Sequence, residues 1–206
     1  MKILMINGSP KPNGNTARCL EEMKRIFEEE GIEIIYHHIG SEALHGCIGC
    51  GSCFKNGKCI RDDAVNDLAP KLAECDGVVV GSPVFYAAPN GSLLALLDRL
   101  FYSTFRTDKR MKVGASIVVA RRGGCSAAFD VLNKYFTISG MPLASSQYWN
   151  SAHGALPGEV EADLEGLQTV RTLARNMVFL MRSIEIGKEK FGLPEREKPA
   201  RTNFIR

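Results

Sequence analysis

Short apolar runs alternate along this chain with longer segments in which apolar residues recur every three or four positions. The short runs are rich in β-branched residues and have the length of strands, whereas the longer segments have the period of amphipathic helices. This alternation is typical of a parallel sheet that helices cover on both faces. The predicted strands are residues 2–6, 33–38, 77–81, 113–119 and 143–149, of which the last is the least apolar. The predicted helices are residues 15–30, 63–74, 91–103, 124–138 and 161–183.

The order of the strands follows from the handedness of their connections. Crossovers between parallel strands are almost always right-handed, so five strand–helix units allow few topologies. We predict an α/β fold with a doubly wound, five-stranded parallel sheet in the order 2-1-3-4-5. In such sheets a ligand binds beyond the carboxyl ends of the strands, where the winding direction reverses. The loops after the first, third and fourth strands are therefore expected to form the binding site.

The size and composition of the chain suit one domain. It has 206 residues, of which 45% are hydrophobic and 24% charged, as in ordinary globular proteins. We place the domain at residues 1–183, with a cysteine-rich insert at 44–62 and a charged C-terminal tail at 184–206. Near its end the tail has two apolar residues, Phe204 and Ile205, which are expected either to fray in solvent or to pack on another subunit.

The net charge excludes some classes of partner. A formal charge of +3, from 26 basic and 23 acidic residues, gives no field of one sign, so neither nucleic acid nor an acidic membrane is expected as a partner. The first apolar run is short and a polar turn follows it, which fits neither a signal peptide nor a membrane span. We therefore expect a cytoplasmic location.

A loop rich in glycine and small polar residues follows the first predicted strand. Its sequence is Asn-Gly-Ser-Pro-Lys-Pro-Asn-Gly-Asn-Thr over residues 7–16, and a long helix begins at its end. Glycines let backbone amides turn toward an anion, polar side chains donate further hydrogen bonds, and the helix N-terminus favours negative charge. The loop has neither the dinucleotide fingerprint nor the ending of a nucleoside triphosphate loop. The candidate phosphate-binding residues are Ser9, Lys11, Asn13, Gly14, Asn15 and Thr16. The alternative is a polar turn that caps the helix, with Asn15 or Thr16 as the N-cap.

These features resemble a known family, the flavodoxin-like NADPH-dependent FMN reductases and the related iron–sulfur flavoproteins. The stretch from Gly8 to Thr16 is similar to the family's loop for the FMN phosphate. A second similarity lies in the sequence Gly-Ser-Pro-Val-Phe-Tyr at residues 81–86, followed by Leu-Asp-Arg at 97–99. The resemblance implies that one segment lies along the flavin ring and ribityl chain, namely Pro83, Val84, Phe85, Tyr86 and Ala87.

The loop after the fourth predicted strand is a looser match to the same family. Paired glycines, Gly123 and Gly124, would let backbone amides approach the flavin ring, and Arg121 would stabilise the charge of a reduced flavin. The alternative is a solvated basic turn. Cys125 adjoins this loop, and His153 is a secondary candidate for a substrate pocket.

The resemblance also carries functional expectations. It implies FMN as the cofactor, with electrons that come from NAD(P)H or a small electron carrier and pass to an unidentified acceptor. The flavin would carry the chemistry, so no catalytic side chain is expected. A homodimer or homotetramer is expected at the level of the family. The alternative function is a non-enzymatic electron carrier between protein partners.

Four of the seven cysteines fall within thirteen residues. Cys47, Cys50, Cys53 and Cys59 have the spacing C-x2-C-x2-C-x5-C, in which three thiolates can wrap one face of an iron–sulfur cubane and the fourth can close it. Zinc sites usually join two cysteine pairs across a longer insert. The spacing is also similar to the compact motif of iron–sulfur flavoproteins, which implies a 4Fe-4S cluster. A pair of redox-active thiols remains open as an alternative, as does zinc.

Overall fold

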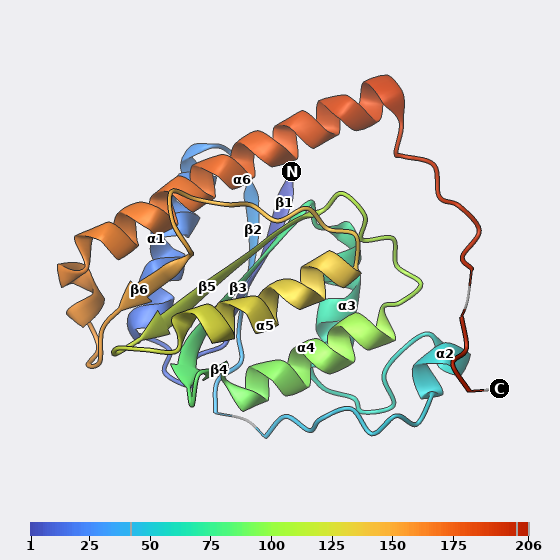
Figure 1. Cartoon of the computed structure of the whole chain (residues 1–206), viewed down its shortest axis with the longest axis horizontal. Coiled ribbons are helices and arrows are strands. Elements are labelled where there is room, and N and C mark those ends of the chain that lie inside the picture. Colours follow the sequence, from blue (N-terminus) through green and yellow to red (C-terminus); the bar gives the residue numbers. More distant parts are fainter. Residues whose placement is uncertain (42, 201, 206) are drawn as a thin grey trace.

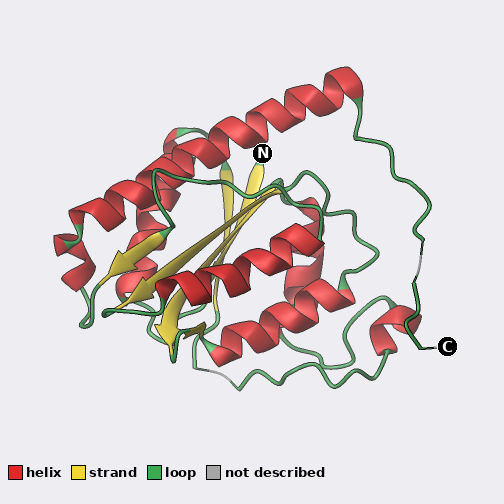
Figure 2. Cartoon of the chain, viewed as in Figure 1, coloured by secondary structure: helices red, strands yellow, loops and turns green. Residues whose placement is uncertain are grey.

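The computed structural model describes residues 1–41, 43–200 and 202–205. Its secondary structure alternates between strands and helices, as the sequence pattern predicts (Figures 1 and 2). The strands are β1 (Lys2–Asn7), β2 (Glu33–His38), β3 (Gly77–Phe85), β4 (Ala88–Pro89), β5 (Val113–Ala120) and β6 (Ser151–His153). The helices are α1 (Asn15–Glu29), α2 (Ser52–Asn56), α3 (Ala64–Glu74), α4 (Gly91–Ser103), α5 (Cys125–Ile138) and α6 (Leu164–Phe191), with a 3₁₀ turn at Glu159–Ala162.

The sheet has the predicted topology. Its order is β2-β1-β3-β5-β6, and the short strand β4 forms an antiparallel hairpin with the end of β3. All other pairings are parallel. Because β4 lies off the main path, this order corresponds to the predicted 2-1-3-4-5, and the doubly wound α/β fold is confirmed.

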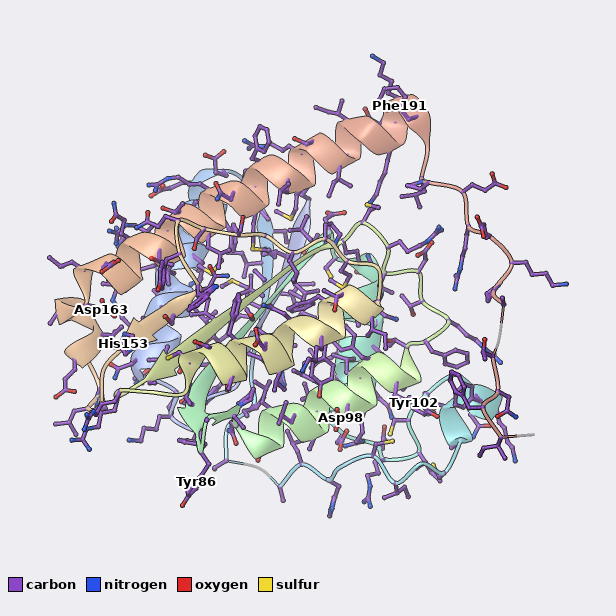
Figure 3. All side chains as sticks on the ribbon, viewed as in Figure 1. Tyr86, Asp98, Tyr102, His153, Asp163 and Phe191 are labelled. Atoms are coloured by element: carbon purple, nitrogen blue, oxygen red, sulfur yellow. The ribbon has the colours of Figure 1, made fainter. Side chains whose placement is uncertain are left out.

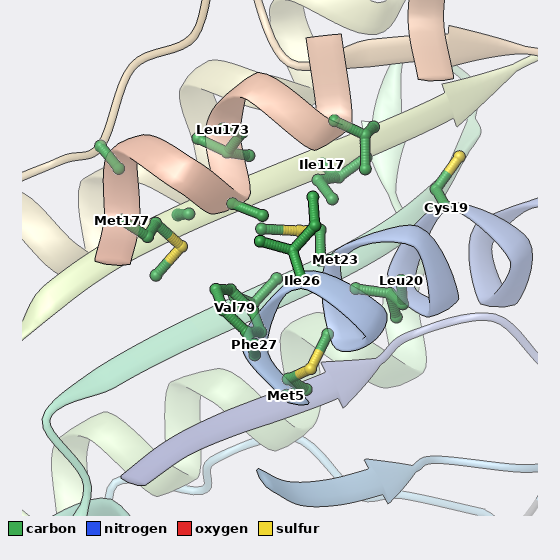
Figure 4. Packing of buried hydrophobic residues seen from close by; sticks show 14 of the residues in the cluster. Met5, Cys19, Leu20, Met23, Ile26, Phe27, Val79, Ile117, Leu173 and Met177 are labelled. Carbon is green, nitrogen blue, oxygen red and sulfur yellow. The ribbon is translucent and has the colours of Figure 1, made fainter. Parts of the chain in front are cut away.

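Two hydrophobic clusters form the core, one on each face of the sheet. Alternate residues of a strand point to opposite faces. Ile3 and Met5 of β1 therefore pack under α1 and α6, whereas Leu4 and Ile6 pack under α3, α4 and α5. Figure 4 shows the first cluster, where Met23 and Phe27 of α1 meet the sheet and α6.

The predicted fifth strand was wrong in its position. Leu143 makes only an isolated bridge with Gly114, and the paired strand β6 begins at Ser151. The intervening polar residues leave the sheet as a loop, which a hydrogen bond of 2.7 Å between the Ser146 Oγ and the Asn150 Oδ1 closes. The loop therefore interrupts the edge strand where the sequence is least apolar.

The last helix differs from the expectation at both of its ends. The last helix begins three residues later than predicted and continues to Phe191 rather than to residue 183. Figure 1 shows that the helix runs past the edge of the sheet. In the tail beyond it, Phe204 and Ile205 are exposed, while Arg206, which belongs to the predicted ending, lies outside the described residues. None of the helices in the described part of the chain is long and apolar enough to span a membrane.

Candidate functional site

Hydrogen bonds hold the loop after β1 against strand β3 and the N-cap residue of α4. The Gly8 amide donates a hydrogen bond of 2.7 Å to the Gly81 carbonyl, and the Asn90 side chain donates one of 2.8 Å to the Gly8 carbonyl. A Cβ atom at Gly8 would clash with a methyl carbon of Leu93 and lie 2.8 Å from the Gly81 carbonyl oxygen, so only glycine permits this approach. The sequence pattern did not identify the buried Asn90, because its role depends on two loops that are 82 residues apart.

The N-terminus of α1 begins directly at this loop without a capping side chain. Its N-cap residue is Gly14, and no side chain of the described residues accepts a hydrogen bond there, whereas Asp63, Asn90 and Asp163 cap the helices α3, α4 and α6. The first amides of a helix have no partner within the helix, and they attract anions. The alternative of a capping turn, with Asn15 or Thr16 as N-cap, is therefore wrong.

A pocket lies beside this helix end, at the carboxyl ends of the strands. It has about 800 Å³ of empty space, including its open side, and the loops after β1, β3 and β5 meet around it. Two cations, Lys11 and Arg121, line it, and no acidic side chain of the described residues does. The pocket therefore has the charge and the backbone donors that an anionic ligand requires. The predicted site residues that line it are Ser9, Lys11, Gly14, Asn15, Thr16, Pro83, Val84, Phe85 and Arg121.

The segment after β6 also lines the pocket, and the sequence pattern did not predict this. Gly154, Ala155 and Pro157 take part in the lining. Because the fifth strand was predicted at residues 143–149, the loop at its carboxyl end was expected too early in the chain. A strand assignment at residues 151–153 would have drawn attention to the Gly-Ala-Leu-Pro-Gly sequence that comes after it.

Asn15 connects this segment to the loop after β1. Its Nδ2 donates a hydrogen bond of 2.9 Å to the Leu156 carbonyl, and its Oδ1 accepts one of 3.0 Å from the Gly158 amide. The side chain was predicted to contact a phosphate directly, and these bonds give it a second task. Thr16, by contrast, is buried beside the same pocket, and its hydroxyl has no hydrogen-bond partner in the described part of the chain.

Five predicted residues, Asn13, Tyr86, Ala87, Gly123 and Gly124, do not line this pocket. Asn13 lines a neighbouring depression on α1, whereas Tyr86 and Ala87 form the tip of the β3–β4 hairpin and have positive φ angles of 51° and 58°. The Tyr86 side chain is fully exposed and points away from the sheet (Figure 3). Gly124 has a φ of 93°, and a Cβ atom there would lie 2.9 Å from the Ala87 Cα. The glycine therefore packs the loop after β5 against the hairpin.

The four clustered cysteines line a second cavity, which also holds two arginines. This cavity has about 370 Å³ of empty space including its open side, and its lining includes Arg61, Arg99 and Tyr102. The cysteines that line it are Cys47, Cys50, Cys53 and Cys59. No disulfide joins any of the cysteines in the described part of the chain. The short helix α2 carries Cys53, and the C-terminal half of α4 forms one wall.

The arrangement of these cysteines bears on the group they could hold. No three His, Cys, Asp or Glu side chains of the described residues are grouped around a point that could hold a metal ion. A single tetrahedral ion needs its ligands close together, whereas the ligands of a four-iron cluster stand around a larger body. Four cysteines around one cavity are a set of ligands of the kind that an iron–sulfur cluster takes.

Two further candidates, Cys125 and His153, lie close to each other. The Cys125 Sγ is 4.0 Å from the His153 Nε2, and the His153 Nδ1 is 3.4 Å from the Asp163 carboxylate. Figure 3 shows His153 and Asp163 together at the same end of the sheet. Burial raises the pKa of the Cys125 thiol, and the negative charge of Asp163 raises it further. The thiol is therefore not activated as a nucleophile.

Comparison with solved structures defines the class of protein. The fold is similar to that of the flavodoxin, WrbA-like protein from Agrobacterium tumefaciens, with a TM-score of 0.62 at 16% identity over 88% of this chain and 97% of that chain. At this identity the similarity shows the fold alone. The structure therefore defines a flavodoxin-like α/β protein.

Comparison of sequences defines the family. Residues 1–155 match the model of the NADPH-dependent FMN reductase family. The chain is 32% identical to an iron–sulfur flavoprotein of Methanocaldococcus jannaschii over 90% of this chain and 100% of that protein. It is 27% identical to an iron–sulfur flavoprotein of Methanosarcina thermophila over 92% of this chain and 100% of that protein. The chain belongs to the NADPH-dependent FMN reductase family, and the resemblance stated from its motifs is confirmed.

Proposed function

We propose that this chain is an FMN-dependent oxidoreductase that holds the flavin phosphate in the loop at residues 8–16. The observation that carries the proposal is the uncapped N-terminus of α1, which faces a pocket with two cations and no acidic lining among the described residues. The family and the names of the flavoprotein relatives support FMN as the anion. When bound, FMN supplies both hydride transfer and single-electron transfer.

The side chains around the pocket have roles of binding and orientation. The hydroxyl groups of Ser9 and Thr16 and the first amides of α1 would bind the phosphate. The Val84 and Phe85 segment would lie along the flavin, and Arg121 would offset negative charge on it. The electron donor would be NAD(P)H or a small electron carrier.

Comparison of FMN with riboflavin tests this assignment, because riboflavin lacks the phosphate. We expect apoprotein to bind FMN much more tightly than riboflavin in a fluorescence titration. The Thr16→Ala variant should bind FMN about tenfold more weakly, because a hydrogen bond to a charged group is lost, with little effect on riboflavin. Thr137→Ala, on the exposed surface of α5, is the matched control. Equal affinity of the wild-type protein for both flavins would refute the phosphate loop.

A second candidate function is favoured by the cysteine cavity. In this alternative the four cysteines hold a 4Fe-4S cluster, as the names of the relatives suggest, and the chain carries single electrons between protein partners. Anaerobically purified protein with about four irons per chain and slow NAD(P)H oxidation would favour the carrier. Flavin without iron and rapid NAD(P)H oxidation would favour the reductase.

A further inference from the structure

Arg99 of α4 is a buried cation whose hydrogen bonds converge on the cysteine-rich segment. Its side chain is only 2% exposed, and it pairs with both carboxylate oxygens of Asp63 at 2.7 and 2.9 Å. Its Nε and Nη2 atoms lie 3.4 and 3.2 Å from the Cys59 Sγ. Both N–H groups point at the sulfur, so the guanidinium donates to it through two hydrogen bonds.

The same side chain joins both ends of the segment. Arg99 donates to the His45 carbonyl at 3.4 Å, just before the first cysteine, and to the Arg61 carbonyl at 3.4 Å, just after the last. Asp63, its ion-pair partner, also caps α3 by accepting a hydrogen bond of 3.1 Å from the Val65 amide. One buried side chain therefore anchors the segment to two helices, α3 and α4.

Cys59 is held both at its backbone and at its sulfur. Asn66 accepts a hydrogen bond of 3.0 Å from the Cys59 amide and donates one of 3.1 Å to its carbonyl. With the two bonds from Arg99, both the backbone and the sulfur of Cys59 are held. Cys47 and Cys50 are exposed, and their thiols have no hydrogen-bond partner among the residues that the structure describes. The cavity therefore has one preorganised sulfur with a permanent positive charge beside it.

The guanidinium of Arg99 can affect the reduction potential of a cluster that is bound through Cys59. Arginine remains charged and can only donate hydrogen bonds. Hydrogen bonds to the sulfur ligands and nearby charge are the means by which a protein sets the reduction potential of an iron–sulfur cluster. A donor to the sulfur withdraws electron density and stabilises the reduced cluster, which raises its potential.

We propose that Arg99 is a positioning residue that fixes Cys59 as a cluster ligand and raises the reduction potential of the cluster through its two hydrogen bonds to the sulfur. The inference rests on the second candidate function, in which the cysteines hold iron and sulfide. It adds a residue outside the cysteine motif to that site and states the direction of its effect.

Two substitutions with opposite expected effects test the proposal. In Arg99→Lys the two hydrogen bonds from the guanidinium to the sulfur are lost, so we expect a more negative midpoint potential of the cluster. An anaerobic redox titration monitored by electron paramagnetic resonance measures this potential. We also expect the variant to lose iron to a chelator faster than the wild type. In Asp63→Asn the guanidinium keeps its bonds to Cys59 but loses its counter-charge, so we expect a more positive potential. A purely structural role would weaken iron retention in both variants without shifting the potentials in opposite directions.

Arg106→Lys is the matched control. Arg106 donates a hydrogen bond of 2.9 Å to the Phe54 carbonyl in the same segment but does not contact a cysteine sulfur. The midpoint potential and the iron content of the Arg106→Lys protein should equal those of the wild type. An Arg99→Lys protein with unchanged midpoint potential and unchanged iron content would overturn the proposal. If that variant does not fold, an unchanged or lowered midpoint potential in Asp63→Asn would overturn it. Wild-type protein that contains no iron after anaerobic purification would instead refute the cluster itself, while FMN affinity would still report on the flavin site.

Discussion

At the scale of single residues, neighbours in the phosphate loop have different tasks that the sequence does not distinguish. Asn13 and Asn15 are both predicted to contact the phosphate, since both are polar residues in the same turn. In the structure the Asn15 side chain bridges to the segment after β6, whereas Asn13 is exposed beside α1. The difference arises from contacts with residues more than 140 positions away, which sequence spacing cannot reveal.

The Asn15→Ala variant tests the bridging role of this side chain. We expect it to weaken FMN binding and also to increase hydrogen exchange at residues 154–160, because the loop loses its bonds of 2.9 and 3.0 Å to Asn15. Asn13→Ala should leave exchange in that segment unchanged. If exchange at residues 154–160 did not change in Asn15→Ala, the bridging role would be wrong.

At the scale of elements, a buried carboxylate joins the two helices on one face of the sheet. Glu22 of α1 is 7% exposed and pairs with Arg18 on its own helix and with Arg171 of α6 at 3.2 Å. Burial raises the pKa of Glu22, but hydrogen bonds from the two arginines outweigh that effect and hold it below its ordinary value. The ionised form is therefore favoured in the folded protein.

The stability of the Glu22→Gln variant should depend on pH in a defined sense. A lowered folded pKa stabilises the protein above the ordinary glutamate pKa, and this contribution is lost as the pH falls through the lowered value. At neutral pH we expect the free energy of unfolding to fall by about 2 kcal/mol, since Arg171 and Arg25 lose the carboxylate they pair with and Arg18 retains Glu161 alone of its two carboxylates. In urea denaturation the difference from wild type should shrink below about pH 4.5.

Glu29→Gln is the control for this prediction. Glu29 is exposed on the same helix and forms no ion pair with any residue in the described part of the chain. Its substitution should change the free energy of unfolding little, both at neutral pH and below about pH 4.5. If Glu22→Gln lowered the free energy of unfolding equally at about pH 3 and pH 7, the ionised carboxylate would not be what stabilises the contact between α1 and α6.

Helices and strands could be predicted correctly where the hydrophobic period and the residues at their ends indicate the same boundaries. The boundaries of α4 are the predicted ones, because Asn90 caps its start and its apolar stripe is regular. The fifth strand could not be placed, since a polar loop interrupts its pairing with β5 and the paired part, Ser151–His153, is only three residues long. The short helix α2 was also missed, because five residues carry no periodic signal.

At the scale of the whole molecule, the cysteines divide between core and surface. Burial raises the pKa of the Cys19 thiol to about 12 and that of Cys75 to about 11. Cys47 and Cys50 are exposed at the second cavity. The sequence spacing alone distinguishes the clustered cysteines from the other three. The contact between Cys59 and Arg99 of α4 could be found only from the fold, because the two residues are 40 positions apart.

Alkylation of metal-free protein should follow this division. With iodoacetamide at about pH 8, Cys47 and Cys50 are expected to react first, and Cys19 and Cys75 only after unfolding, because a thiol must be accessible and deprotonated to react. Peptide mass spectrometry measures the order. Labelling of Cys19 in folded protein as fast as Cys47 would contradict the buried environment described for it.

The helix α4 touches both candidate sites, and this limits how the chain can vary in length. Its cap residue Asn90 holds Gly8 at the first pocket, and Arg99 contacts Cys59 at the second. The roughly nine residues from one to the other span about 14 Å along the helix, and each added residue rotates the rest of the helix by about 100°. An insertion or deletion of one residue within α4 would point Arg99 away from Cys59 while Asn90 stayed in place. The length of this helix therefore couples the geometry of the two sites, although they lie in different loops.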